Sequence, residues 1–232
     1  MQIGALGDIH GDFDTVQAIM ARHADVPLWV QVGDIASNDG EYFTPSHPLY
    51  WIKGNNEDFD VIAEAMAGRP PADTLFYLPN GGAYTVGPWR VAALGGTFAP
   101  SWYHSSVAQL PPSRGRRASG SQQMKLGKSR DDKRRHFVRE EVLACKALTG
   151  VDLFLTHEAP RPFFPAGRRI DTGKTAINEV LTAMRPRLHL FGHHHEFTDS
   201  VRQGVRSIGL DLVSKSYLLI DADTFRCERL DT

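Results

Sequence analysis

Cysteine is scarce in this chain of 232 residues, which has only Cys145 and Cys227, and neither lies in a metal-type spacing. Two such residues do not form a disulfide framework, so we expect them to be core or incidental residues in a reducing compartment. No apolar run approaches the ~18 residues that a membrane-spanning helix needs, and no basic and apolar leader precedes the first predicted strand. These absences predict a cytoplasmic protein without a signal peptide or a membrane span.

An excess of charge of one sign is also missing, because 26 Lys and Arg face 27 Asp and Glu and the net charge is −1. The field of the whole molecule therefore does not favour a nucleic-acid or membrane partner. We find neither a low-complexity linker nor a repeat of fixed period. With 41% hydrophobic and 23% charged residues, the chain is predicted to form a single domain over residues 1–232 that buries a sizeable core.

One segment departs from this balance of charge. Between residues 114 and 135 lie nine Lys or Arg and two Asp, a local net charge of +7 that leaves −8 for the remainder. A Pro-Pro pair and a Ser-Gly-Ser run are typical of loops, so a basic loop insertion is predicted around residues 100–135. It is either a solvated loop or a contact for a phosphate-rich ligand. Three aromatic residues would then be available to stack on bases: Phe98, Trp102 and Tyr103.

Apolar runs of strand length alternate with runs of helical period along most of the chain. Buried strands are predicted at residues 3–6, 28–32, 49–52, 151–155 and 188–191. Amphipathic helices are predicted at residues 16–23, 59–66, 138–148 and 177–184, the second with Asp58 as its N-cap. Residues 75–97, with an Asn80-Gly81-Gly82 turn, are predicted to form short antiparallel strands, and three more β runs are predicted at 200–208, 217–220 and 225–229. This order predicts an α/β fold with mixed sheets.

The five buried strands all end in polar residues of the kind that bind metals. In chain order these residues are Asp8, His10, Asp34, Asn55, His157, His193 and His195. Because ligands collect at the carboxyl ends of strands in open α/β sheets, we expect these side chains to meet in one crevice. Carboxylate, amide and imidazole groups bind hard to borderline divalent ions. Seven of them suffice for two ions that share a carboxylate, and two ions about 4 Å apart suit in-line displacement at phosphorus.

In their order along the chain these motifs resemble those of the calcineurin-like metallophosphoesterases. They are Asp8-x-His10, Gly33-Asp34, Gly54-Asn55, His157 and Gly192-His193-x-His195. The resemblance implies a four-layer α/β/β/α sandwich with two mixed β-sheets, and a centre of two divalent metal ions such as Mn, Fe, Zn or Ni. By motif position, Asp34 would bridge the two ions. One ion would be held by Asp8, His10, Asp34 and His195, and the other by Asp34, Asn55, His157 and His193.

Two departures from the family pattern bear on the reaction. Ser37 stands where the pattern Gly-Asp-x-x-Asp has its second Asp, and Asn56 stands where Gly-Asn-His-Asp/Glu has His. In phosphomonoesterases of the family that His is thought to help protonate the leaving group. An amide can hydrogen-bond a phosphate oxygen but cannot act as an acid, which favours a phosphodiesterase and makes Asn56 a candidate for catalysis and substrate binding. His194 is a second candidate for substrate binding that either lines the pocket or points to solvent.

We therefore expect a metal-dependent phosphoesterase, with a phosphodiesterase favoured, in which Asp34 holds two metals that activate a hydroxide. Nucleotides or nucleic-acid phosphodiesters are the leading substrate class. The alternatives are a phosphomonoesterase or protein phosphatase-like activity, and a non-catalytic metal-binding scaffold on the same fold.

A weaker resemblance, to RNA lariat debranching enzymes, lies in the middle of the chain. It is carried by residues 91–98, by the pair Trp102-Tyr103 and by residues 151–160. Asp8 stands where those enzymes often carry Cys, and Asn56 stands where they keep His. The likeness is therefore taken as similarity within a subgroup and not as a sign of lariat cleavage.

Overall fold

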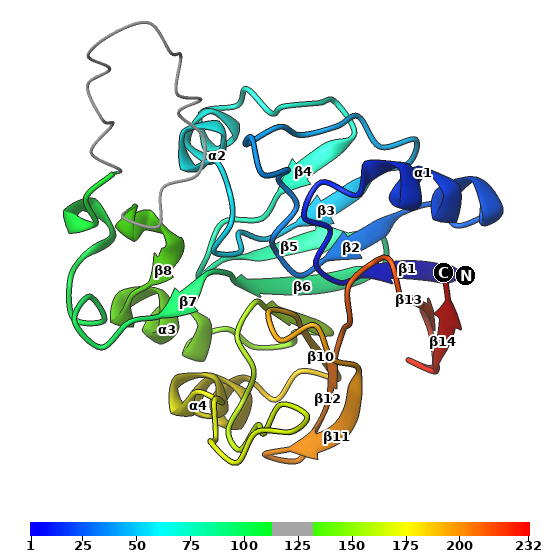
Figure 1. The fold of residues 1–232 in the computed structure, drawn as a ribbon. Helices are drawn as coiled ribbons and strands as arrows, with labels where there is room; N and C mark the ends of the chain where they lie inside the picture. Colours follow the sequence, from blue (N-terminus) through cyan, green and yellow to red (C-terminus); the bar gives the residue numbers. More distant parts are fainter. Residues whose placement is uncertain (113–131) are drawn as a thin grey trace, which may run out of the picture.

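The computed structural model describes residues 1–112 and 132–232 and is built around two six-stranded sheets (Figure 1). Sheet A runs in the order β14 (Cys227–Asp231), β13 (Ser216–Asp221), β1 (Gln2–Leu6), β2 (Trp29–Gln31), β3 (Leu49–Trp51) and β4 (Leu75–Tyr77). Sheet B runs in the order β11 (Thr198–Arg202), β12 (Val205–Gly209), β10 (Leu188–Phe191), β9 (Leu153–Thr156), β6 (Trp89–Leu94) and β5 (Ala83–Val86). Each sheet combines parallel central strands with antiparallel pairs towards an edge, so the mixed sheets predicted from the sequence are confirmed.

Helices cover the outer face of each sheet. The helices α1 (Phe13–Arg22) and α2 (Phe59–Met66) pack on sheet A, and α3 (Arg139–Lys146) and α4 (Thr175–Met184) pack on sheet B. Short 3-10 turns, η1 (Val107–Gln109) and η2 (Lys133–Arg135), and a small sheet of β7 (Thr97–Phe98) with β8 (His136–Phe137) lie beside α3. The result is the expected four-layer α/β/β/α sandwich.

Period-two alternation along the strands explains the layers. In β2, Trp29 packs under α1, whereas its neighbour Val30 points into the core between the sheets. In β9, Phe154 faces the helices on the other side, and Leu155 faces the same central core as Val30. Because successive side chains of a strand point to opposite faces, each apolar strand serves two cores at once.

Local signals set the helix boundaries. The carboxylate of Asp58 accepts hydrogen bonds from the amides of Asp60 and Val61 and begins α2, as the sequence predicted for an N-cap. Later in the chain, the end of α4 is followed by Arg185 in the left-handed region, φ 50°, and then by Pro186. A proline cannot continue a helix, so the chain turns there into β10.

Two details of the predicted strands are wrong. The segment 75–78 was expected to form an antiparallel hairpin with the strand after the turn, but β4 pairs with β3 in parallel at the edge of sheet A. The Asn-Gly-Gly turn carries the chain from sheet A to sheet B because the Asn80 side chain bonds both the amide (2.6 Å) and the carbonyl (3.0 Å) of Gly95. The run 200–208 is likewise not one strand, since Gln203 and Gly204 both have positive φ and form a tight turn between β11 and β12.

Most of the predicted basic loop, residues 113–131, lies outside the described residues. Of its cations, Arg134 lies in η2, where its guanidinium bonds the carboxylate of Asp132 and lies 2.8 Å from that of Asp60. None of the helices in residues 1–112 and 132–232 is long and apolar enough to span a membrane.

Candidate metal centre

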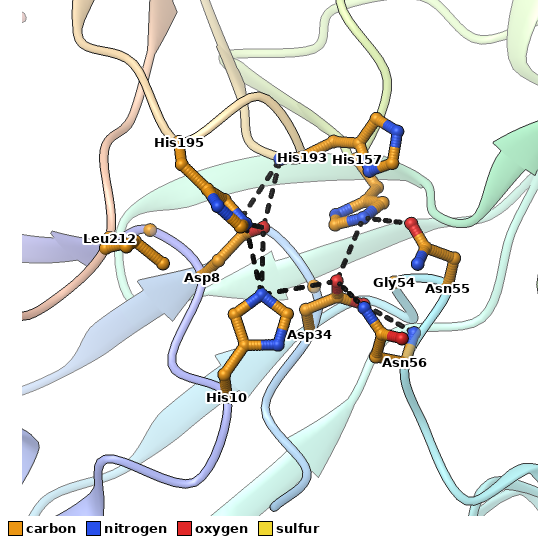
Figure 2. A network of polar contacts seen from close by, with 12 residues as sticks. Asp8, His10, Asp34, Gly54, Asn55, Asn56, His157, His193, His195 and Leu212 are labelled. Atoms are coloured by element: carbon orange, nitrogen blue, oxygen red, sulfur yellow. Dashed lines mark hydrogen bonds and ion pairs between the residues drawn. The ribbon is translucent and has the colours of Figure 1, made fainter. Parts of the chain in front are cut away.

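The predicted metal ligands come together at the carboxyl ends of β1, β2, β3, β9 and β10 (Figure 2). Four of them have positive φ, namely His10 (50°), Asp34 (64°), His193 (71°) and His195 (53°). Side-chain-bearing residues rarely adopt this region, and each costs about 1–3 kcal/mol unless its surroundings stabilise it. Strained backbone in the described residues is therefore concentrated at the strand-end turns that direct these side chains inward.

Two glycines allow the turns to approach each other. A β-carbon on Gly54 would collide with the carboxylate of Asp34, and one on Gly192 would collide with the carboxylate of Asp8. Because glycine carries no side chain, the backbone after β3 can lie against Asp34 and the backbone after β10 against Asp8. The glycines that precede the predicted ligands in the sequence thus have a steric role in assembling the site.

One compact group of donors joins β1 to the turn after β10. The Nε2 atom of His195 lies 3.0 Å from Oδ2 of Asp8 and 3.1 Å from Nε2 of His10. Two imidazole nitrogens this close share a single proton or a cation. Nitrogen ligands about 2.0–2.1 Å from a tetrahedral ion lie a little over ~3 Å from one another. The geometry of Asp8, His10 and His195 therefore fits a divalent ion.

A second group joins sheet A to β9. The Nδ1–H of His157, which is completely buried, donates to the carbonyl of Val32 at 2.8 Å and so fixes the tautomer of the ring. The Nε2 atom then faces Oδ1 of Asn55 at 3.1 Å and Oδ2 of Asp34 at 3.6 Å. A divalent ion in place of the proton on Nε2 would contact the ring nitrogen and both oxygens, so this group fits a cation.

Asp34 lies between the two groups. Its Oδ2 atom is 3.7 Å from Nε2 of His10 and 3.6 Å from Nε2 of His157 (Figure 2). Burial raises the pKa of Asp34, but the positive charge of His157 and then of His10, with hydrogen bonds from Asn56, lowers it below its ordinary value overall. The carboxylate is therefore ionised and central. Asp8 is also shared, since it lies within reach of both compact groups.

Asn56 is partly exposed and bonds the carboxylate of Asp34. Its amide N–H donates to Oδ1 of Asp34 at 2.7 Å, and its side-chain Nδ2 donates to Oδ2 at 2.8 Å. These two bonds fix both oxygens of the central carboxylate. The structure thus assigns to Asn56 a positioning contact that the sequence did not predict.

The two remaining histidines of the last motif lie differently. The backbone N–H of His193 donates to both oxygens of Asp8, at 3.1 and 3.2 Å, while its ring packs 4.9 Å from that of His157. His193 is in neither compact group of donor atoms. The ring of His194 stacks on Phe163 at 4.4 Å, and its Nε2 is buried without a partner among the described residues. Burial, and then the charge of Lys174, lowers the pKa of His194 to about 4.

Sequence reasoning missed the role of Glu57, which is 1% exposed. Its carboxylate accepts the amides of Ile35 (3.1 Å), Ala36 (3.3 Å) and Gly54 (3.2 Å), and the hydroxyl of Tyr42 (2.9 Å). It therefore ties the turn that carries Asp34 to the turn that carries the next ligand. Burial, and then the charge of Asp34, raises the pKa of Glu57 to about 7. An acidic residue at a fixed place after a ligand was the available signal.

Gln31 was also missed. Its side-chain amide is fully buried, donates to the carbonyls of Gly7 (3.1 Å) and Gly33 (2.5 Å), and accepts the amide of Gly33 at 2.7 Å. It thus fixes the ends of β1 and β2 next to each other, immediately before Asp8 and Asp34. A polar residue inside an otherwise apolar strand run was the signal that could have found it.

Comparison with known proteins agrees with this geometry. The sequence model of one family, described as calcineurin-like phosphoesterase, matches residues 1–197. The lariat debranching enzyme of Schizosaccharomyces pombe is 25% identical over 241 residues, which cover 85% of this chain and 49% of that protein. The chain thus spans about half the length of this curated relative.

Solved structures share the fold. The structure of TT1561 from Thermus thermophilus superposes with a TM-score of 0.62 at 14% identity, covering 99% of this chain and 98% of that one. GAP50, the anchor in the inner membrane complex of Plasmodium, has a TM-score of 0.52 at 11% identity, covering 100% of this chain and 88% of that one. At these identities the likeness concerns the fold alone.

Proposed function

The chain belongs to the calcineurin-like phosphoesterase family, whose members hydrolyse phosphate esters, and we propose that it is a phosphodiesterase dependent on two divalent metal ions. The observation that carries the proposal is the position of Asp34. Its buried carboxylate oxygen lies almost equally far, 3.7 and 3.6 Å, from an imidazole nitrogen of each donor group. A shared carboxylate flanked by two sets of metal-type donors is the arrangement expected of a dinuclear centre.

Two ions would divide the donors around Asp34. In this assignment Asp34 is common to both sets. The first set is Asp8, His10, Asp34 and His195, and the second is Asp34, Asn55, His157 and His193. When bound, divalent ions such as Mn, Fe, Zn or Ni would supply Lewis acidity, activate water at neutral pH and neutralise charge on the phosphate.

The residues of this chain prepare the site for that chemistry. The bond from His157 to the carbonyl of Val32 orients Nε2 into the crevice, and Glu57 fixes the turn of Asp34. Asn56 holds both oxygens of Asp34, so that carboxylate cannot rotate away from the donors on either side. Such outer contacts orient ligands and raise metal affinity.

Asn56 favours diesters over monoesters as substrates. An amide donates hydrogen bonds but cannot supply a proton to a leaving alkoxide, as the histidine at this place in related phosphomonoesterases is thought to do. The leaving group of a substrate for this enzyme must therefore be stable without an acid from this position. Asn56 remains a candidate contact for a phosphate oxygen when substrate is present.

Nucleotides or nucleic-acid phosphodiesters are the substrate class that we propose. The sequence similarity to a lariat debranching enzyme supports it, as does the basic composition of residues 114–135. A non-catalytic scaffold on the same fold is disfavoured because all seven ligand positions hold metal-type residues and five of them lie in compact donor groups, namely Asp8, His10, Asp34, His157 and His195.

Hydrolysis of bis(4-nitrophenyl) phosphate and of 4-nitrophenyl phosphate tests the proposal. Metal-stripped protein is supplied with Mn, Fe, Ni or Zn, and Asp34→Ala is compared with Asp25→Ala, a change of an exposed carboxylate. We expect diester cleavage that requires metal, exceeds monoester cleavage and falls by about 1,000-fold or more only in Asp34→Ala. Monoester cleavage that exceeds diester cleavage would favour a phosphomonoesterase. Metal binding without turnover of either ester would favour the scaffold.

A further inference from the structure

A cleft of about 730 Å³ opens beside the metal centre, and His193 and His195 form part of its wall. The facing wall is the segment between β9 and α4. Among the residues that line the cleft are Arg168, Lys174, His194, Glu196, Asp211 and Lys215. Because predicted metal ligands line the cleft, a substrate whose scissile phosphate sat at the centre would extend into it.

The wall between β9 and α4 is held in place by its own side chains. The carboxylate of Asp171 accepts the amides of Phe163 (2.8 Å) and Gly173 (2.9 Å) and the Nε–H of Arg161 (2.6 Å). It therefore closes residues 161–173 into a compact loop. A further bond, from the amide of Ala166 to Oε2 of Glu196 at 2.8 Å, ties this loop to the turn of the metal ligands.

Both carboxylates of the cleft already have partners. Oε2 of Glu196 accepts the amide of Ala166, and Oδ1 of Asp211 accepts the amide of Leu212 at 2.8 Å and lies 3.1 Å from Nζ of Lys215. These acidic groups serve to hold the walls together. Among the lining residues the three cations Arg168, Lys174 and Lys215 outnumber these two carboxylates.

Unused donors of the cleft lie on the facing loop and on His194. Lys174 lies 3.6 Å from Oε2 of Glu158 and also donates to the carbonyl of Thr172. In contrast, the exposed guanidinium of Arg168 has no hydrogen bond or ion pair within residues 1–112 and 132–232. The buried Nε2 of His194, in a ring fixed against Phe163, also has no partner there.

Resting on the proposed phosphodiesterase function, we propose that this cleft binds a second anionic group, a phosphate next to the scissile phosphate, through Arg168, Lys174 and His194. A guanidinium, an ammonium and an imidazole are the donors that bind phosphate in proteins, and Arg matches its oxygens in pairs. The preferred substrate is then a diester with a neighbouring phosphate, from a nucleic acid or a nucleotide, and not a diester of simple alcohols.

Two matched substrates test this proposal, namely thymidine 5′-(4-nitrophenyl phosphate) with and without a 3′-phosphate. We expect the 3′-phosphate to raise kcat/KM by about tenfold in the wild-type enzyme with metal, and this gain to shrink as salt rises. Arg168→Ala should abolish most of the gain. The control Arg169→Ala removes the same charge from the next residue, which is also exposed but does not line the cleft. This variant should retain the gain from the 3′-phosphate.

A binding measurement tests the proposed phosphate site without the need for turnover. Titration calorimetry should show thymidine 3′,5′-bisphosphate binding more tightly than the 5′-monophosphate to wild type and to Arg169→Ala, but not to Arg168→Ala. Equal rates and equal affinities for the paired compounds, with metal-dependent cleavage of both, would overturn this inference and leave the phosphodiesterase intact. Absence of cleavage in metal-loaded protein would instead overturn the phosphodiesterase, and the inference with it.

Competition distinguishes the two sources of the second phosphate. If a four-residue single-stranded oligonucleotide inhibits at lower concentration than the bisphosphate, the cleft binds the next phosphate of a polymer. The reverse order assigns it to the terminal phosphate of a nucleotide. Inhibition by neither compound would contradict a phosphate site in this cleft.

Discussion

Two histidines of sheet B, His157 at the end of β9 and His189 in the middle of β10, are both completely buried, yet their surroundings are opposite. His157 faces carboxylates, and although burial lowers its pKa, Asp34 and then Asp8 raise it above the ordinary value overall. His189 lies between aromatic rings and faces no carboxylate, so burial lowers its pKa to about 3.

The contrast shows that burial alone does not make a functional histidine. The hydroxyl of Thr156 donates to the carbonyl of Glu158, so its oxygen accepts the Nε2–H of His189 at 2.8 Å, and the hydroxyl of Ser207 lies 3.1 Å from Nδ1. Every polar atom of the neutral ring is thus satisfied within the sheet. At the strand ends, the imidazole nitrogens instead face carboxylate, amide or imidazole atoms that can bind the same cation.

Removal of the Asp34 carboxylate should have the largest effect on the difference between the strand-end site of His157 and the interior site of His189. If Asp34 bridges two ions, Asp34→Asn should bind neither ion tightly, whereas His195→Asn, at the half-exposed side of the site, should keep about one ion per chain. Elemental analysis of dialysed protein measures both. Asp8→Asn is the informative third variant, because Asp8 also reaches both donor groups. Retention of one ion by Asp34→Asn and of none by Asp8→Asn would make Asp8 the bridge.

Glu57 tests whether the strand-end turns depend on buried charge. Glu57→Gln places an NH₂ group against backbone N–H groups that now donate to a carboxylate, so we expect stability to fall by about 2–4 kcal/mol and metal affinity by about 10–100-fold. Tyr42→Phe removes one hydrogen bond to the same carboxylate and the acceptor of the Asp58 amide, and should cost only about 1–2 kcal/mol. Urea unfolding and metal titration give the two values, and equal effects in both variants would show that Glu57 merely fills space.

Much of the fold could be predicted because its signals are local. The buried strand runs, the helical periods and the Asp58 cap each depend on residues near one another in the sequence, and all were confirmed. The partner of β4 was wrong because a turn motif indicates a change of direction but not which sheet receives the next strand. That choice depends on contacts between distant residues, such as Asn80 with Gly95.

The candidate metal centre likewise has a part that could be predicted from the sequence and a part that could not. Which residues gather at the crevice followed from the rule that strand ends meet, and the described structure brings them together. Their outer contacts could not be predicted, since Glu57 and Gln31 act through the backbone of other turns. Nor could the bonds from Asn56 to Asp34, which depend on the unusual left-handed backbone of Asp34 itself.

The last effect that we expect concerns His189 in the interior of sheet B and appears in the pH dependence of stability. The pKa of His189 is about 3 in the folded protein and about 6.5 in an unfolded chain. Its neutral form therefore stabilises the fold fully above about pH 6.5, and this contribution is lost progressively as the pH falls towards 3. Between pH 7 and pH 5 the wild-type protein should lose about 2 kcal/mol through this residue alone.

His189→Gln removes the titrating group from the interior of the sheet. Whatever its absolute stability, the loss that the variant shows between pH 7 and pH 5 in urea unfolding should be smaller than that of wild type by this amount. His104→Gln, a change of an exposed histidine, should leave the wild-type slope unchanged. Identical slopes for wild type and His189→Gln would mean that His189 accepts a proton without penalty, and that the interior of sheet B is as tolerant of charge as its carboxyl edge.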